Sequence, residues 1–431
     1  MRGQKTKLIG RLISSVRDMQ QRHEERHRPS GFHFAFADRI DYLHPERWDG
    51  VTAEASIFLR RDILRVVEKH GPDNIEPRYA LICRDEKPVA ALAAQLVTVT
   101  GAQLMRGDTR ADQPRPLLKR IMAPASRAAG ANFQERMLVA GNLLSWGFHG
   151  VAFASGENPK ELWPGVAEAV YRIRRAARLS GQTNLVMLKD VTPQETGLES
   201  FRRFSYRPLE TEPNMVLQID PAWNTYDDYL AALDSKYRRN AKDQLKKLAA
   251  ADCRLERLDD VAAYARRLHE LYLAVHANSS IRLVTLPETY LSALAAAVGR
   301  DFRCNVLRRG EDILGFITSI RDGHTAIGYY IGFDRAAAAA GLPIYLRLLH
   351  STIQDAIDWR CQRLSLGRTA LEPKAALGAK PEPMFIWLRH RMPALNWIIR
   401  GLLGAVPHNA APERSPFKVK GFRHPASGPA E

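Results

Sequence analysis

The strongest constraint on the fold is an order of predicted elements that occurs twice along the 431 residues. In each half, a hairpin of apolar strands is followed by a strand, a helix, a strand and a second helix. In the first half these elements are expected at 79–84, 88–100, 137–153, 160–179, 184–188 and 194–204, with a last strand at 215–219. In the second half they are expected at 303–308, 313–320, 325–333, 342–359, 363–366 and 372–377. Strands that alternate with helices predict the α/β class, with mixed α+β sheets flanked by helices.

Length and composition agree with two globular domains. A chain of this length is long enough for two or three domains, and an apolar fraction of 45% excludes a disordered or collagen-like protein. We expect a basic arm over 1–30, an N-terminal domain over 31–221 and a C-terminal domain over 222–431. Three helices are predicted before the second hairpin, over 226–250, 261–276 and 287–298, and they form a helical insertion in the C-terminal domain.

The net charge of the chain limits the kinds of partner that it is expected to bind. The formal net charge is +16, which favours acidic partners such as nucleic acid, anionic lipid, a phosphorylated cofactor or an acidic carrier protein. The four cysteines are far apart and form no CxxC pair, so the sequence predicts neither a disulfide framework nor a zinc module. The N-terminus has no continuous apolar segment of the secretory kind. We therefore expect a cytoplasmic protein, with a peripheral position at the inner membrane as an open alternative.

Several common catalytic motifs do not apply. His23–His27 (HEERH) fits the zinc-protease pattern, but it lies in a polar arm without an apolar face to bury a metal site. The sequence has no P-loop, no dinucleotide-binding glycine motif after a strand and no G-x-S-x-G elbow. We expect no metal site.

Two segments resemble one known family. Residues 226–242 (YDDYLAALDSKYRRNAK) are similar to the helix that opens the second domain of Fem-like proteins. Residues 367–379 (GRTALEPKAALGA) resemble the C-terminal pattern of that family, in which a lysine stands four residues before a glycine. Fem-like proteins carry tandem domains of the GNAT acyltransferase fold. The resemblance implies two tandem GNAT-like domains and transfer of an acyl or aminoacyl group to an amine acceptor.

The resemblance also implies a set of catalytic residues. Lys374 matches the family lysine and would bind the donor's phosphate or carbonyl oxygen, and Arg368 would lie beside the cleft. Glu372 could accept the proton of the amine. Either Tyr329 or Tyr330 could reprotonate the leaving group from the cleft side of its strand, with Tyr330 assigned to catalysis. Ordinary structural roles stay open for all of them: a solvated lysine, an Arg368–Glu372 salt bridge and core tyrosines.

Further residues are assigned to binding the substrate. Tyr329 and Gly332 lie on the central strand, and Lys236, Arg238 and Arg239 open a basic helix that could bind tRNA phosphates or an acidic carrier. A solvated helix face is the alternative for these cations.

The donor would lie at the loop over 334–343. CoA-dependent GNAT enzymes bind pyrophosphate on the backbone N–H groups of a glycine-rich loop, and here Gly341 and Leu342 occupy that place. The loop has only one glycine, and Pro343 removes one N–H donor. This departure argues against acyl-CoA and fits a Fem-like protein better, because that loop is degenerate in the family. The loop over 154–159 in the first half also departs from the pattern, so we expect the N-terminal domain to shape the acceptor site without catalysis.

Three readings of function therefore remain. The leading one is a Fem-like N-acyltransferase that moves an acyl or aminoacyl group from a phosphorylated or acidic donor, with aminoacyl-tRNA among the candidates, to an amine. The second is an N-acyltransferase that uses acyl-CoA or acyl carrier protein and acts on a small amine or an aminolipid. The third is a non-catalytic basic binding protein on the same scaffold. The stretch over 384–407, rich in Trp and Arg, is expected to be a helix, either in the core or on a membrane surface.

Overall fold

The computed structural model describes residues 28–100, 134–277, 282–392, 396, 412 and 414–418. The chain divides into two compact units. The first contains Met1–Thr211, Ser280–Leu286 and Met384–Val406, and the second contains Glu212–Ser279, Pro287–Pro383 and Pro407–Glu431. The first unit thus includes two segments that the sequence analysis placed in the C-terminal domain.

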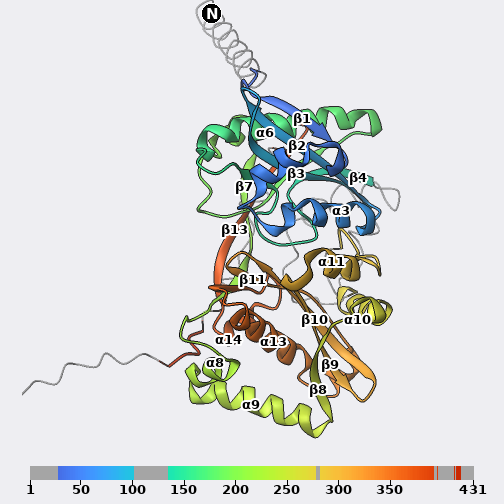
Figure 1. Ribbon diagram of the computed structural model, residues 1–431, viewed down its shortest axis with the longest axis vertical. Helices are drawn as coiled ribbons and strands as arrows, with labels where there is room; N and C mark the ends of the chain where they lie inside the picture. The colour runs from blue at the N-terminus through green and yellow to red at the C-terminus, as the bar shows by residue number, and fades with distance from the viewer. Residues whose placement is uncertain are drawn as a thin grey trace, which may run out of the picture. The chain divides into compact units, whose positions relative to one another are not determined.

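The first unit is built on one mixed sheet (Figure 1). Its strands follow the order β1 (His33–Ala37), β2 (Ile75–Arg84), β3 (Lys87–Thr100), β4 (Gln134–Ala140), β6 (Leu185–Val191) and β13 (Lys380–His390), and β5 (Val151–Phe153) pairs with β3. Strands β4 and β6 are parallel, and the other described pairs in this unit are antiparallel. Asp85 and Glu86 join β2 to β3 with φ of 47° and 66°, the left-handed values that a tight hairpin turn requires.

Helices cover both faces of this sheet. They are α2 (Pro45–Thr52), α3 (Arg61–His70), α6 (Pro159–Ala176) and α7 (Glu199–Arg203), with short 3-10 turns at Ile40–Tyr42, Ile57–Leu59 and Ala177–Ser180. Helix α6 begins where the Asn158 side chain accepts a hydrogen bond from Lys160 N at 3.2 Å. Its apolar residues, among them Trp163 and Val166, are buried in one core cluster, while Trp48 of α2 belongs to a second cluster.

The second unit repeats the arrangement. Its strands follow the order β7 (Arg207–Gln218), β12 (Arg363–Ser365), β11 (Thr325–Phe333), β10 (Asp312–Asp322), β9 (Phe302–Arg309) and β8 (Cys253–Leu258). Strands β11 and β12 are parallel, like β4 and β6 in the first unit. The order of hairpin, strand, helix and strand therefore occurs in both units. The predicted α/β class with mixed sheets is confirmed.

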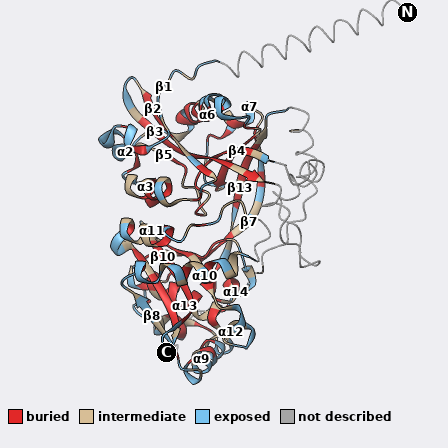
Figure 2. Cartoon of the chain, turned by 90° about the vertical axis from the view of Figure 1, so that its right-hand side faces the viewer, coloured by how far each residue is buried: buried red, intermediate tan, exposed pale blue. Residues whose placement is uncertain are grey.

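Seven helices are described in the second unit. They are α8 (Tyr226–Ala232), α9 (Ser235–Ala250), α10 (Ala265–His276), α11 (Tyr290–Val298), α12 (Arg335–Ala339), α13 (Ile344–Asp358) and α14 (Leu371–Ala376), with 3-10 turns at Ala262–Tyr264 and Gly299–Asp301. Figure 2 shows buried residues concentrated along the strands and on α13.

One predicted helix is divided in two. The sequence analysis expected a continuous helix over 226–250, but Leu233 and Asp234 are extended between α8 and α9. Leu233 forms a bridge with Phe417, and Asp234 N donates to Pro416 O at 2.8 Å. A segment distant in the sequence thus takes backbone hydrogen bonds at this break, and helical periodicity cannot reveal such a partner.

The predicted helix over 384–407 is wrong for its first part. Residues 384–390 belong to β13, and Phe385 to His390 pair with β6. Met384, Ile386, Trp387 and Leu388 are all buried, and the pairing register with β6 shifts between Phe385 and Trp387. A short apolar run of this kind has no periodicity that separates strand from helix. Most of the remaining stretch lies outside the described residues, as do residues 1–27 of the basic arm, including His23–His27.

A membrane-spanning helix is not found in the described parts of the chain, since none of their helices combines the necessary length and apolar character.

A β-bulge changes which residues of β11 face each of the helices that cover it. The register between β10 and β11 shifts between Ile317 and Ser319, so that two residues of β11 lie opposite Thr318. Before the bulge, Gly328 faces Thr352 of α13. After it, Gly332 faces the backbone of α10, where an added Cβ would lie 2.5 Å from Tyr272 N. Without the bulge, both glycines would face the same helix, because strand residues four apart share a face.

We expect Gly332→Ala to destabilise the second unit by about 1–3 kcal/mol, because the methyl group would force α10 away from β11. Urea unfolding would measure the free-energy change. Gly50→Ala is the control: no atom lies within 4 Å of its added Cβ, and alanine is favoured in helix α2. Equal stability of the Gly332 variant and the wild type would contradict the close packing.

Candidate active site

Lys374 is buried in the helix that follows the parallel strand pair of the second unit. Its side chain lies in α14 and is 3% exposed. Burial lowers the pKa of its ammonium to about 7. Within the described residues the structure shows no carboxylate paired with it. A buried amine without a counter-ion is costly to a fold, and such groups are concentrated at functional sites.

The chain around α14 fixes the place of this lysine. Ala370 enters the helix in the left-handed conformation, with φ of 50°, and Gly378 leaves it with φ of 94°. The end of β12 is anchored where Ser365 Oγ and Gly367 N both donate to Asn214 Oδ1 of β7 at 3.1 Å. The helix is therefore held at both ends.

Glu372 does not share a site with Lys374. Residues two apart on a helix face different sides, and Glu372 lies on the side of α14 away from the lysine. Its carboxylate forms an ion pair with the Arg414 guanidinium, and the two side chains are 51% and 40% exposed. The salt bridge considered between Arg368 and Glu372 is thus replaced by one to Arg414. Arg368 is partly buried in the connection between β12 and α14.

Tyr329 and Tyr330 lie at the bulge and not on opposite faces of a regular strand. Tyr330 N donates to Thr318 Oγ1 at 2.9 Å, and that hydroxyl donates to Tyr330 O at 3.3 Å. The two rings contact each other edge-on with centroids 4.6 Å apart. The expected alternation fails here because the extra residue turns both side chains to the same face.

These tyrosines belong to one aromatic cluster. The Tyr329 hydroxyl lies 3.0 Å from that of Tyr290 in α11, and the Tyr330 ring contacts Tyr272 of α10. Burial raises the pKa of both Tyr329 and Tyr330 well above the usual value, so they keep their protons at neutral pH. Gly332, also assigned to substrate binding, faces the backbone of α10 rather than a cavity.

The loop proposed for the donor is closed by its own hydrogen bonds. The Asp334 carboxylate accepts from Ala336 N at 2.8 Å and from Ala337 N at 3.0 Å. Gly341 N donates to Ala338 O, and Leu342 N donates to Ala337 O. These four backbone donors of the loop are therefore occupied, and the partner of two of them is itself an anion.

The basic residues of α9 differ in their surroundings. Lys236 and Arg239 are exposed, whereas Arg238 is partly buried and donates to Leu233 O at 3.1 Å and Ala231 O at 3.3 Å. Arg238 therefore fastens the junction of α8 and α9. Lys236 and Arg239 stay available to an anionic partner.

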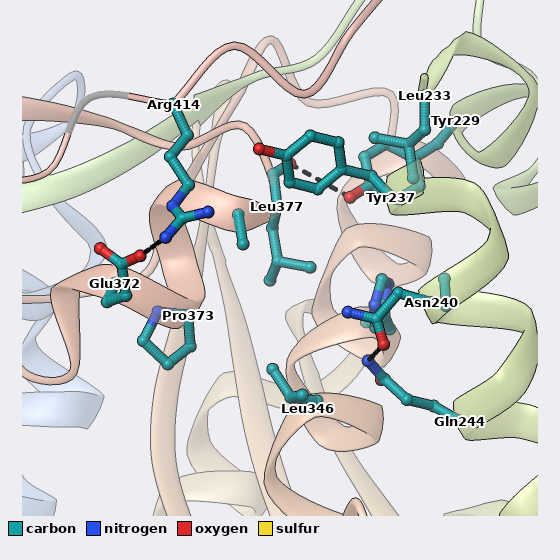
Figure 3. Close-up of a pocket in the computed structure, with 13 residues that line it drawn as sticks. Tyr229, Leu233, Tyr237, Asn240, Gln244, Leu346, Glu372, Pro373, Leu377 and Arg414 are labelled. Atoms are coloured by element: carbon teal, nitrogen blue, oxygen red, sulfur yellow. Dashed lines mark hydrogen bonds and ion pairs between the residues drawn. The ribbon is translucent and has the colours of Figure 1, made fainter. Parts of the chain in front are cut away.

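A cavity of about 220 Å³ lies between α9, α13 and α14 (Figure 3). It is lined by Tyr229, Leu233, Tyr237, Asn240, Ala241, Gln244, Leu346, His350, Glu372, Pro373, Ala376, Leu377 and Arg414. His350 Nδ1 lies 2.9 Å from the Tyr226 hydroxyl, and burial lowers the pKa of His350 to about 3. The imidazole is thus neutral at physiological pH. Lys374 is not part of this lining.

Sequence reasoning missed a polar cluster in the first unit. Lys189 and Asp190 form a buried ion pair at the carboxyl end of β6, beside the parallel strand β4. Lys189 Nζ donates to Ser145 O at 2.8 Å, and Gly147 N donates to Asp190 Oδ2 at 3.0 Å. The two charged residues within the apolar strand over 185–191 were the sequence signal that could have indicated this cluster. His350, in an apolar helix, gave a weaker one.

Potential metal ligands do not gather in the parts of the chain that the structure describes: no group of three His, Cys, Asp or Glu side chains is found there.

Comparisons with known proteins place the second unit in a family. Residues 235–375 match the model of the acetyltransferase (GNAT) domain, a range that includes Lys374. The sequence matches no curated protein. Among solved structures, FemX is similar over 85% of this chain and 99% of its own, with a TM-score of 0.51 and 10% identity.

Two further structures are less similar. A tandem GNAT protein from the clavulanic acid biosynthesis pathway has a TM-score of 0.47 and 12% identity, over 84% of this chain and 99% of its own. L-PGS from Bacillus licheniformis has a TM-score of 0.43 and 10% identity, over 79% and 96%. At 10% identity, the likeness to FemX concerns the fold. The GNAT domain match agrees with the family expected from residues 226–242 and 367–379: residues 235–375 form an acetyltransferase domain of the GNAT type, and the fold over most of the chain is similar to that of FemX.

Proposed function

We propose that this protein is an N-acyltransferase that moves an acyl or aminoacyl group to an amine, with Lys374 of the second unit as its essential cation. The observation that carries the proposal is the burial of Lys374 without a paired carboxylate, inside the GNAT domain. An apolar side chain of similar size would fill the same space at lower cost to the fold. The ammonium is therefore best explained by the reaction.

The chemistry of acyl transfer gives Lys374 two possible tasks. The amine nitrogen attacks the carbonyl carbon of the donor, a C–N bond forms, and the carbonyl oxygen becomes an oxyanion. The C–O or C–S bond to the donor then breaks, the leaving oxygen or sulfur gains a proton, and the amine loses one. A cation near the oxyanion stabilises this intermediate. With a pKa of about 7, Lys374 can also give its proton to the leaving group.

The other assigned residues take supporting roles in this proposal. Arg368 lies between β12 and α14 and would orient the donor beside Lys374. Tyr330 keeps its proton at neutral pH and would donate a hydrogen bond from the bulge. Glu372 as the acceptor of the amine proton has weaker support, because it lies on the other face of α14 and pairs with Arg414.

The closed loop over 334–343 favours a donor other than acyl-CoA. Acyl-CoA is the usual donor of GNAT domains, but the Asp334 carboxylate already occupies the N–H groups of Ala336 and Ala337. A phosphate there would meet a negative charge. We therefore propose aminoacyl-tRNA as the donor, with Lys236 and Arg239 on α9 as phosphate contacts. Acyl carrier protein is the next candidate among anionic donors.

The same proposal includes the compartment in which the reaction takes place and the role of the first unit. Four buried free cysteines fit a reducing cytoplasm, where charged tRNA is available. The first unit, whose Lys189–Asp190 pair fills the carboxyl end of β6, would shape the acceptor site without catalysing transfer.

Lys374→Met should lower the rate of transfer about 10²–10³-fold, the usual loss when one oxyanion-stabilising group is removed. Steady-state kinetics with the donor identified below would measure it. Lys380→Met removes an exposed lysine of the same unit and should leave the rate unchanged. Full activity of the Lys374 variant would remove the basis of the proposal.

The same lysine makes stability depend on pH. Its pKa is about 7 in the folded chain and 10.5 when unperturbed, so between these values the unfolded chain binds more protons. Stability should therefore rise with pH across this window, by up to about 1.4 kcal/mol per pH unit. Relative to Lys374→Met, the wild type should gain about 2 kcal/mol of unfolding free energy between pH 7 and pH 9. A difference that stays constant with pH in urea titrations would show that Lys374 is not buried as described.

Thermal shift against candidate donors separates the readings of function. A ligand at 100 times its dissociation constant stabilises the fold by about 2.7 kcal/mol. We expect stabilisation by aminoacyl-tRNA, with weaker binding at high salt and in the Lys236→Glu, Arg239→Glu double variant. A shift with acyl-CoA and none with charged tRNA would make acyl-CoA the donor. Tight tRNA binding without transfer to any amine would favour a non-catalytic binding protein.

A further inference from the structure

The cavity between α9, α13 and α14 is a separate site from Lys374. Glu372, Pro373, Ala376 and Leu377 line it from one side of α14, and Lys374 lies on another side of that short helix. Its volume of about 220 Å³ is below the 300–1,000 Å³ typical of sites for drug-sized ligands. The cavity therefore suits a small metabolite.

One end of the cavity presents two opposite charges side by side. Glu372 and Arg414 form an ion pair at this end, and both side chains are about half exposed (Figure 3). Among the described residues that line the cavity they are the only charged groups, because His350 is neutral with a pKa of about 3. An exposed ion pair contributes little to stability, so opening it for a ligand is not expensive.

The opposite side presents amides. Gln244 Nε2 donates to Asn240 Oδ1 at 3.1 Å, and both residues come from α9. Gln244 is only 9% exposed, and its carbonyl oxygen has no hydrogen-bond partner in the part of the chain that the structure describes. A buried acceptor without a partner is unfavourable. Because this oxygen has almost no accessible surface, a ligand N–H or O–H would reach it only after the Gln244 amide turns toward the cavity.

The space between these two ends is mainly apolar. Leu233, Leu346 and Leu377 contribute aliphatic side chains, and Ala241 and Ala376 leave room between them. An apolar body of a few carbon atoms would exclude water from this part of the cavity.

We propose that the cavity binds a free α-amino acid with an uncharged side chain. The ligand carboxylate would pair with Arg414 and the ammonium with Glu372, so one protein ion pair is exchanged for two ion pairs with the ligand. The side chain would occupy the apolar space and reach toward Gln244. A ligand with a single charge would leave either Glu372 or Arg414 without a partner, and this penalty selects the zwitterion.

Isothermal titration of the full chain with each of the twenty common L-amino acids tests the proposal. We expect saturable binding of at least one amino acid with an uncharged side chain. The tightest binder is then compared with the amine that lacks its carboxylate and the acid that lacks its amino group. Each should bind at least tenfold more weakly. Equal binding of either analogue, or no binding of any amino acid at 10 mM, would overturn the proposal.

Variants locate the binding site. Arg414→Gln and Glu372→Gln should each weaken binding at least tenfold, while Arg254→Gln, in an exposed ion pair with Asp252 of the same unit, should not. Ala376→Leu fills the cavity without changing its charge and should abolish binding. Circular dichroism confirms that each variant is folded. Wild-type affinity in Ala376→Leu, or in both charge variants, would place the ligand elsewhere.

The outcome does not depend on the proposed transfer reaction. Amino-acid binding that persists in an inactive Lys374→Met variant would support this site, whatever the donor is. Loss of binding in Arg414→Gln with transfer retained would also support it, as a site separate from catalysis. Transfer without any amino-acid binding would overturn this inference and leave the proposed function intact.

Discussion

The hydrogen bonds of Thr318 to both backbone groups of Tyr330 determine how the second unit is assembled. They stabilise the bulge that places two residues of β11 opposite one residue of β10. Because the alternation of the strand shifts there, Gly328 before the bulge faces α13 and Gly332 after it faces α10. The same irregularity turns Tyr329 and Tyr330 into one aromatic cluster with Tyr290.

Each unit has a parallel strand pair, and the two units differ in how they neutralise the buried lysine that lies near it. In the first, Lys189 and Asp190 at the end of β6 neutralise each other and are tied to the backbone of Ser145 and Gly147. In the second, Lys374 follows β12 and lacks such a carboxylate among the described residues. One unit thus satisfies its buried charge internally, and the other keeps a charge that a substrate can use. This contrast agrees with a single catalytic unit in the chain.

Helix α14 has six residues and carries two features that are important to the proposals above. One side carries the buried lysine, whose lowered pKa makes proton transfer near neutrality accessible. The other side forms the end of a cavity with an exposed ion pair. Since residues two apart on a helix diverge, a single turn can hold one side chain in the interior and another at a cavity. Gly367 N donates to Asn214 Oδ1 ahead of this helix, and Gly378 N and Ala379 N donate to Ala375 O and Lys374 O at its end.

The sequence by itself determined the local elements and their order. Alternating apolar residues predicted the hairpins, and the family pattern around Lys374 identified the residue that the structure finds buried. What it could not provide depends on partners distant in the chain: the break at Leu233 beside Phe417, the pairing of Glu372 with Arg414, and the strand over 384–390 that joins β6. Periodicity and propensity describe a residue's neighbours along the chain. Burial, register and charge pairing are decided by packing between segments, and only the tertiary structure contains them.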